Sequence, residues 1–299
     1  MTRSFRAGLC ALGFVLAAAS LAQAQAQEPT ATKRATGDDT GALQAKEPTG
    51  PAQPTPRHPN GKPDFTGYWK VLRGDGKPGG NIGRDLPGYK LPFSPAGQAA
   101  LQYNLTKTVD PEATCQLGGI PRHNGSGLPF EILATPQRAA FLYFYTTYRL
   151  IPIDGRKPDA DPDPAYFGNP VAHWEGDSLV IQSNGFKDSK DGKLWIDENA
   201  NPQSDATQVT ERWTRPDRNH LKLAMTVDDK KYYTRPFEFT RTWVLGEPGE
   251  GLKEYACNEN NLDAAHLGPG PGVIRADGTR GYAADVQLPA VPPGPEAYQ

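Results

Sequence analysis

The chain has few cysteines, few methionines and no apolar run long enough to cross a membrane. It contains 3 Cys and 2 Met among 299 residues. No Cys-x-x-Cys pair occurs, which argues against a thiol redox site. The strongly apolar run near the N-terminus, Leu9 to Leu21, is shorter than the roughly 20 residues of a transmembrane helix. We therefore expect no integral membrane segment in the mature protein.

An excess of charge of either sign is absent as well. The formal net charge is -2 and the pI is near 6.2, which leaves no basic face for nucleic acid or for an anionic membrane. The histidines show no zinc-binding spacing, and prolines interrupt the aspartates of 159–163 that begin like a calcium loop. No Gly-x-Ser-x-Gly elbow and no phosphate-binding glycine loop occurs. We expect no metal and no cofactor.

The N-terminus has the features of an export signal. Arg3 and Arg6 precede the apolar run, and Ala24 and Ala26 follow it at the -3 and -1 positions of a cleavage site. Residues 1–26 are therefore predicted to be a cleaved signal peptide, and the protein is predicted to be periplasmic or secreted.

Two cysteines remain after cleavage, because Cys10 lies inside the predicted signal. In an oxidising compartment Cys115 and Cys257 are expected to form a disulfide, and the alternative is a pair of free or redox-active thiols. A bridge across so long a loop would stabilise the fold by about 4 to 5 kcal/mol on the chain-entropy model.

Short strands separated by turn-forming residues dominate the second half of the chain. Alternating apolar residues between 167 and 258 predict six strands: Val171–Trp174, Ser178–Phe186, Thr207–Arg215, His220–Val227, Phe237–Leu245 and Leu252–Cys257. The turns are too short for a helical crossover, so neighbours in sequence must pair as an antiparallel meander. Earlier strands are predicted at Pro63–Val71, Phe130–Thr135 and Ala139–Ile151. The last has apolar residues on both parities and is predicted to be covered on both faces.

One helix is predicted beside the sheet, at Ala96–Leu105, with Ser94 as its N-cap and Pro95 at its first position. The fold class is therefore all-β, an antiparallel up-and-down, lipocalin-like barrel of about eight to ten strands with one flanking helix. The expected domains are the signal at 1–26, a disordered leader at 27–60, the barrel at 61–267 and a disordered Gly/Pro-rich tail at 268–299. A short helix is also predicted near Leu262 to Leu267.

Two side chains of opposite charge are predicted to point into the barrel, because each lies on the same face of its strand as apolar residues. Glu211 lies on the face of Trp213, and Arg241 lies on the face of Trp243. Since an isolated buried charge is costly, we expect Glu211 and Arg241 to pair with each other. The pair is either purely structural or functional. In the functional case Arg241 anchors an anionic or carbonyl group of a ligand, and Glu211 orients it or acts as a general base.

Further candidates lie at the ends of strands, where the mouth of a barrel collects functional groups. His173 and Asp205 join Glu211 as catalytic candidates. His173 is also explained as an exposed turn residue, and Asp205 borders the loop Glu198 to Ser204, which could line a barrel mouth. The ligand-binding candidates are Arg241, Trp213, Trp243, Tyr233 and Asp197.

A set of short motifs connects the chain to known families. They are Trp174-Glu175-Gly176-Asp177, Thr210-Glu211-Arg212, Asp228-Asp229, Tyr233-Thr234-Arg235-Pro236 and Glu254-Tyr255-Ala256-Cys257-Asn258-Glu259-Asn260. Together these motifs resemble an uncharacterised family of secreted bacterial proteins, over about residues 63–266, which implies a bacterial context and no known activity. Members often carry His where this chain has Gln203. Gly67-Tyr68-Trp69 is also similar to the Gly-x-Trp opening of lipocalin-like barrels, which implies that Arg241 packs over Trp69.

Three functions stay open from the sequence. The first is a barrel that binds a small, partly aromatic or apolar ligand in its interior. The second is a cofactor-independent hydrolase, lyase or isomerase that uses acid and base residues at the barrel interior or mouth. The third is a structural or interaction protein with a packed core. The sequence does not determine the oligomeric state.

Overall fold

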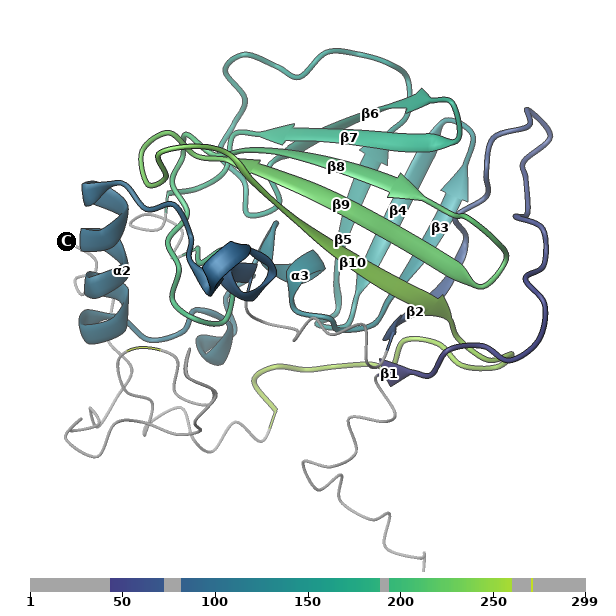
Figure 1. Cartoon of the computed structure of the whole chain (residues 1–299), viewed down its shortest axis with the longest axis horizontal. Helices are drawn as coiled ribbons and strands as arrows, with labels where there is room; N and C mark the ends of the chain where they lie inside the picture. Colours follow the sequence, from purple (N-terminus) through teal and green to yellow (C-terminus); the bar gives the residue numbers. More distant parts are fainter. Residues whose placement is uncertain (1–43, 73–81, 189–193, 260–269, 271–299) are drawn as a thin grey trace, which may run out of the picture. The chain divides into compact units, whose positions relative to one another are not determined.

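One antiparallel sheet curves into a nearly closed barrel (Figure 1). The computed structural model describes residues 44–72, 82–188, 194–259 and 270. Its strands are β1 (Gln44–Ala45), β2 (Gly67–Leu72), β3 (Phe130–Thr135), β4 (Arg138–Tyr143), β5 (Thr147–Pro152), β6 (Asn169–Glu175), β7 (Ser178–Asn184), β8 (Gln208–Thr214), β9 (His220–Asp228) and β10 (Phe237–Leu245). Its helices are α2 (Pro95–Lys107) and α3 (Arg122–Gly125), with 3-10 turns η1 (Ile82–Asp85), η2 (Pro87–Tyr89) and η3 (Glu112–Thr114).

The order of strands explains why the barrel has one parallel contact, between β5 and β6, which we call the seam. The path around the barrel is β5-β4-β3-β2-β10-β9-β8-β7-β6, so the early strand β2 pairs with the late strand β10. This path has an odd number of strands, so they cannot alternate in direction all the way around. One neighbouring pair must run parallel, and that pair is β5 and β6. They meet through a single parallel bridge between Ile153 and Ala172, and the long connection 153–168 returns the chain to the starting end.

The all-β barrel class is confirmed, but the predicted strand Ala139–Ile151 is wrong, because it is two strands. The chain turns between β4 and β5, where Thr146 has a φ of 54°, and Tyr143 pairs with Thr147. The outward-facing apolar side chains of residues 139–151 are also not all covered as predicted, since Tyr148 is 64% exposed and Leu150 is 52% exposed.

The predicted strand Leu252–Cys257 is also absent, and the segment is irregular. Tyr255 uses its backbone to bond a side chain, because its N–H donates to Thr146 Oγ1 at 3.1 Å and its carbonyl accepts from the same hydroxyl at 2.6 Å. These bonds replace the ladder that a paired strand would have made.

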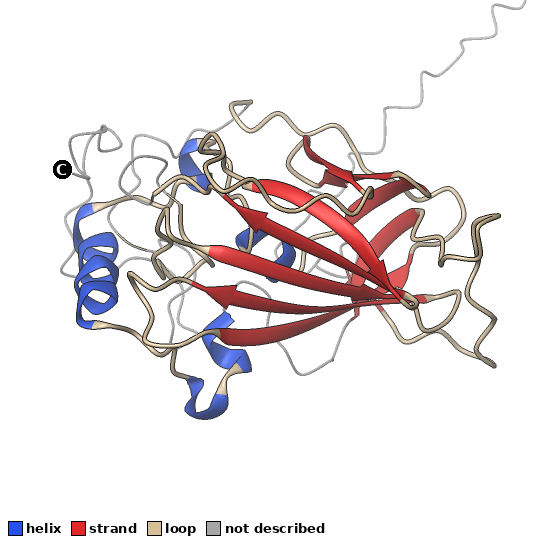
Figure 2. Cartoon of the chain, turned by 90° about the horizontal axis from the view of Figure 1, so that it is seen from above, coloured by secondary structure: helices blue, strands red, loops and turns tan. Residues whose placement is uncertain are grey.

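The helix predicted at Ala96–Leu105 is confirmed as α2. Ser94 Oγ accepts the N–H of Gly97 at 3.1 Å, which caps the helix as expected. The helix packs on loops beyond one end of the strands: Gly97 lies against the backbone of Tyr232, and Asn104 Nδ2 donates to the carbonyl of Ala200 at 3.0 Å. Viewed from above, the helices gather toward that end of the sheet (Figure 2).

The predicted leader extends into the described residues. There β1 pairs in parallel with β2, and Arg57 forms an ion pair with Asp177 at 2.6 Å. The predicted signal peptide, the helix at 262–267 and nearly all of the predicted tail lie outside the described residues. Within those residues, no helix is both long and apolar enough to span a membrane.

Aromatic side chains fill the centre of the barrel. Trp213 and Trp243 lie with ring centroids 5.3 Å apart, Phe130 meets Trp243 at 5.1 Å, and Phe141 meets Trp213 at 5.3 Å. All four are fully buried. Edge-to-face and tilted contacts of this kind stabilise beyond the area that they bury. The middle of the barrel is therefore a packed core.

Candidate functional site

Glu211 points inward as predicted, but its partner is Arg149 of β5. Arg149 Nη1 lies 2.6 Å from Glu211 Oε1, and both side chains are at most 1% exposed. The other carboxylate oxygen of Glu211 accepts from Trp213 Nε1 and from Asn124 Nδ2, each at 3.0 Å. Arg149 Nη2 also donates to Ser183 Oγ at 2.6 Å. The buried carboxylate is thus held by both charged and neutral donors.

Arg241 also points inward, and its partner is Asp85 of η1. The predicted pairing of Glu211 with Arg241 is therefore wrong. Strand β9 lies between β8 and β10, which separates the two backbones by about 10 Å at the usual strand spacing. Arg241 Nε also donates to the carbonyl of Gly125 at 3.1 Å.

The predicted contact of Arg241 with Trp69 is wrong too. Arg215 lies over the ring of Trp69, with its guanidinium carbon 4.8 Å from the centroid, whereas Arg241 lies 5.1 Å from the ring of Phe239. A cation does cover the first tryptophan of the barrel, but it comes from the end of β8.

The helix α3 closes one end of the barrel and will be called the plug. Asn124 of the plug is fully buried, donates to Glu211 and accepts from the hydroxyl of Tyr143 at 3.2 Å. The carbonyl of Gly125 binds Arg241. Both buried ion pairs of the core are therefore bonded to the plug, the helix labelled α3 in Figure 1.

The other predicted site residues do not come together. His173 is 38% exposed on β6 and lies 3.1 Å from Glu175, while Asp205 is 54% exposed and pairs with Lys231. Trp213 and Trp243 are in the packed core, and Tyr233 is buried with its hydroxyl donating to the carbonyl of Pro202 at 2.7 Å. Their proposed roles in catalysis or ligand binding stay predictions.

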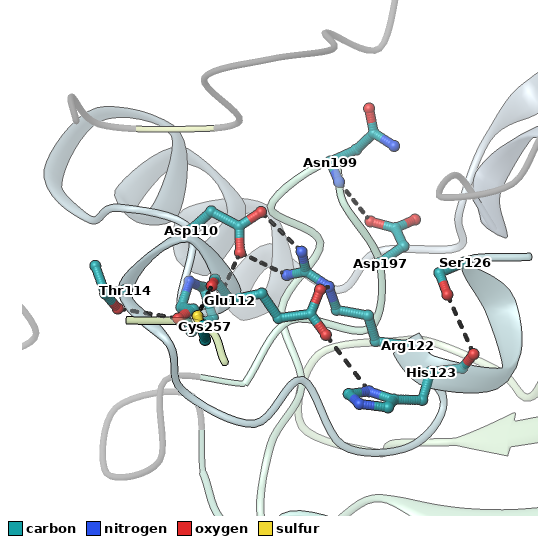
Figure 3. A network of polar contacts seen from close by, with 10 residues as sticks. Asp110, Glu112, Thr114, Arg122, His123, Ser126, Asp197, Asn199 and Cys257 are labelled. Atoms are coloured by element: carbon teal, nitrogen blue, oxygen red, sulfur yellow. Dashed lines mark hydrogen bonds and ion pairs between the residues drawn. The ribbon is translucent and has the colours of Figure 1, made fainter. Parts of the chain in front are cut away.

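Asp197 is the one predicted residue that lies near a larger polar cluster (Figure 3). It is 1% exposed and accepts the N–H groups of Ile82 and Asn199 and the amide of Asn201. Burial raises the pKa of Asp197 in spite of these hydrogen bonds. Its oxygens are occupied by neutral donors, so its role here is to hold the loop after Leu194.

Arg122 of the plug is the only cation at the centre of this cluster in the part of the chain that the structure describes. It binds Asp110 through two parallel hydrogen bonds of 2.8 Å, and its Nε lies 2.9 Å from Glu112 Oε2. The guanidinium is 2% exposed and lies over the ring of Trp195. This bidentate geometry fixes the carboxylate of Asp110. The guanidinium contacts Glu112 through Oε2, and Oε1 of Glu112 lies on the side of His123.

His123 follows Arg122 on the plug and faces Glu112. Its Nδ1 lies 3.4 Å from Glu112 Oε1, and its side chain is 3% exposed. Neither ring nitrogen makes a well-aligned hydrogen bond within the described residues, although the backbone of Gly119 lies close enough to raise the pKa of the ring against the effects that lower it. The ring contacts Tyr143 and Phe167, each at 5.1 Å, and Tyr145 at 5.9 Å. Burial and the charge of Arg122 lower the pKa of His123 to about 3, so the imidazole is neutral.

The pKa of Glu112 shifts in the opposite direction to that of His123. Burial raises the pKa of Glu112 to about 7, against the opposing attraction of Arg122. Burial also raises the pKa of Glu198, whose carboxylate has no hydrogen bond or ion pair among the described residues. A carboxyl that titrates near neutral pH beside a neutral imidazole is able to exchange a proton with a bound molecule.

Two tyrosines border the carboxylates on the solvent side. Tyr145 and Tyr255 have ring centroids 5.2 Å apart, and Tyr255 is 36% exposed. Both carboxylates Glu112 and Glu198 act on the pKa of Tyr145, which they and burial raise. We call Glu112, His123, Tyr145, Glu198 and Tyr255 the plug site.

A disulfide holds the two walls of the plug site together. Cys115 and Cys257 are bonded, with Cα atoms 5.6 Å apart, which confirms the predicted pair. Cys115 follows η3, which begins with Glu112, and Cys257 lies two residues after Tyr255. The bridge therefore joins the segment with the carboxylate to the segment with the exposed ring.

The sequence reasoning missed Arg122, His123 and Glu112, because they lie in irregular segments where no periodicity tells which side chains are buried. Arg149 carried a usable signal, since it shares the parity of the buried Phe141 and Ile151.

Metal binding finds no support in this geometry: within the described ranges no group of three or more His, Cys, Asp or Glu side chains is arranged to hold an ion. Gln203, at the position where His was expected from the resemblance, is buried and donates to the carbonyl of Ile120 at 3.0 Å.

Comparisons with known proteins found no match to this chain. The chain matches no family model, no curated protein and no solved structure.

Proposed function

We propose that this protein is an exported barrel that binds a small, partly aromatic molecule at the plug site. The observation that carries the proposal is the cluster of Glu112, His123 and Glu198 next to two tyrosine rings, one of which, Tyr255, is 36% exposed. Polar groups with unused bonding capacity, beside apolar rings, are the usual composition of a small-molecule site.

The location differs from the interior site that the sequence favoured. Four large aromatic rings occupy the centre of the barrel, and the inward charges Glu211 and Arg241 are each buried in an ion pair. At the plugged end, by contrast, Glu112 is 13% exposed and Tyr255 is 36% exposed. The plug site therefore lies closer to solvent than the two inward ion pairs do.

Export is supported by the disulfide, since such bonds persist in oxidising compartments. Expression of the full chain in a bacterium, followed by the intact mass of the periplasmic form, tests it. We expect the mature protein to begin at Gln27 with its two remaining cysteines oxidised. A full-length or reduced cytoplasmic product would contradict the assignment.

The binding proposal is tested by ligand-observed NMR with a panel of small aromatic compounds that includes cations, neutral molecules and anions. We expect at least one member to bind with a Kd below about 1 mM, a typical upper limit for a small-molecule site. Replacing Tyr255 with Ala should abolish that signal. The matched control is Tyr148→Ala, because Tyr148 is 64% exposed on the outer face of β5.

Two results would remove the proposal. One is the absence of binding by every member of the panel, which would favour a structural protein with a packed core. The other is equal loss in both tyrosine variants, which would place the contact outside the plug site.

A second candidate function is acid–base catalysis without a cofactor. It is favoured by one contact, the 3.4 Å approach of His123 Nδ1 to Glu112 Oε1, which joins a carboxyl of raised pKa to a neutral imidazole. Turnover of any bound compound, lost in Glu112→Gln with binding retained, would establish it. Stoichiometric binding without turnover would leave the protein a carrier.

A further inference from the structure

The plug site has more negative charge than its one cation can compensate. Asp110, Glu112, Asp197 and Glu198 surround Arg122 and act on one another's pKa values. The guanidinium gives both of its Nη groups to Asp110 and its Nε to Glu112 Oε2. Glu112 Oε1 and the whole carboxylate of Glu198 are left over.

A second, independent observation is the imidazole of His123. Its side chain is 97% buried, its Nδ1 faces Glu112 Oε1 at 3.4 Å, and neither nitrogen makes a well-aligned hydrogen bond within the described part of the chain. Buried polar atoms in native proteins usually have a partner, so an imidazole without a well-aligned bond points to a partner that binds from outside. A neutral imidazole offers one acceptor, and the two carboxylates offer several more.

Two aromatic rings complete the environment. Tyr145 lies 5.9 Å from His123 and 5.2 Å from Tyr255, measured between ring centroids. The faces of tyrosine rings attract cations, and the effect is larger where water is excluded.

We propose that the ligand of the plug site is a protonated organic amine that carries an aromatic ring. The inference rests on the proposed binding function and names its ligand class. The ammonium group donates to Glu112, Glu198 and His123, and the ring packs against Tyr145 and Tyr255. An ammonium has three donors and no acceptor, which matches a site that has acceptors in excess.

Other ligand classes fit less well. An anion would meet four carboxyl groups with Arg122 already engaged. A bare metal ion lacks a group of close side-chain ligands among the described residues. A neutral alcohol satisfies the hydrogen bonds but leaves the charge of Glu198 and Glu112 uncompensated.

The proton is the natural competitor of such a cation. Glu112 has its pKa raised to about 7 by burial, and burial raises that of Glu198 as well. The other titratable groups that face them are Asp110, Asp197, Arg122, His123, Tyr145 and Tyr255. Since His123 is neutral above about pH 3, the carboxyls are the groups that release protons when a cation arrives.

Calorimetry with three probes of similar shape tests the class: 2-phenylethylamine, 2-phenylethanol and 3-phenylpropionate. We expect the amine to bind at least tenfold more tightly than the alcohol at pH 7.5, and the acid not to bind. At pH 6, measurements in two buffers of different ionisation enthalpy should show release of a proton from the protein, and at pH 8.5 the release should vanish.

The variant that isolates the charge is Glu198→Gln, which keeps the size of the side chain. It should weaken the amine about tenfold and leave the alcohol unchanged. The matched control is Glu238→Gln, an exposed glutamate on the outer face of β10, which should leave all three affinities unchanged.

The outcomes distinguish a failure of the proposed ligand class from a failure of the proposed binding site. Equal binding of amine and alcohol, or preference for the acid, with loss in Tyr255→Ala, would overturn the amine and keep the plug site. No binding by any of the three, together with no binding across the wider aromatic panel, would remove the site itself.

Discussion

Single residues of the plug site give this protein an unusual dependence of stability on pH. Glu112 has a folded pKa of about 7, above its ordinary 4.5, because it is buried. Its contribution to stability is fully present below pH 4.5 and is lost as the pH rises through 7. His123 has a folded pKa of about 3, below its ordinary 6.5, because of burial and Arg122. Its contribution is present above pH 6.5 and is lost as the pH falls through 3. The two slopes are opposite in the window where they overlap.

We predict that the two contributions cancel between pH 4.5 and 6.5 and that Glu112→Gln removes the cancellation. Each full proton is worth about 1.4 kcal/mol per pH unit. The free energy of unfolding of the variant, measured in urea, should therefore rise with pH across this window by on the order of 1 kcal/mol per unit relative to the wild type. Glu238→Gln is the control. A variant that follows the wild-type pH profile would show that Glu112 is not protonated in the fold.

The sequence predicted two of the charged core residues but not the residues with which they pair. Strand parity alone places Glu211 and Arg241 inside, and both are buried. Their partners come from elements that parity does not reach, since Asp85 lies in a 3-10 turn and Arg149 lies beyond the turn at Thr146. The plug site was invisible for the same reason: its orientation depends on contacts between loops far apart in sequence.

At the scale of elements, the plug is a four-residue helix that no local signal stabilises. It has no side-chain cap, and every one of its residues is buried. An isolated helix of this length does not form in water. Its stability comes from tertiary bonds, chiefly those of Asn124 to Glu211 and Tyr143 and that of Arg122 to Asp110.

Asn124→Ala should therefore destabilise the protein far more than an ordinary surface change. It leaves Tyr143 and one bond of Glu211 unsatisfied in the core, at about 1 to 3 kcal/mol for each buried group. Urea unfolding measures the loss, and amide exchange should show early opening of residues 119–126. The control is Asn60→Ala, since the side chain of Asn60 also accepts a hydrogen bond, in its case from the backbone N–H of Lys62, but is exposed. Equal losses in the two variants would mean that the plug is held by other contacts.

At the scale of the whole molecule, the meander was predictable and its closure was not. Turn spacing fixes which strands are neighbours in sequence, and these pairs are present from β6 to β10. The pairing of β2 with β10 joins strands far apart in the sequence, so no turn predicts it. The parallel contact of β5 with β6 exists because residues 139–151 form two strands, which makes the number of strands around the barrel odd.

The connection between β5 and β6 divides the chain into two half-barrels. Each half contributes one partner to both of the buried ion pairs. The half before the connection contributes Asp85 and Arg149, and the half after it contributes Arg241 and Glu211, so both buried ion pairs cross from one half to the other. The disulfide crosses as well. A half-barrel on its own would expose its aromatic interior and carry one acid and one base with no partner for either.

Fragments 27–158 and 159–299 should accordingly be unfolded when separate and should complement each other when refolded together under oxidising conditions. The complex should elute at the size of the intact chain and regain its near-ultraviolet circular dichroism. Arg149→Met in the first fragment should weaken reassembly, because Glu211 would be buried alone. A fragment that folds without its complement would contradict this interdependence. The connection between β5 and β6 is thus the place where this chain tolerates a break, and a circular permutant that begins there should keep the barrel.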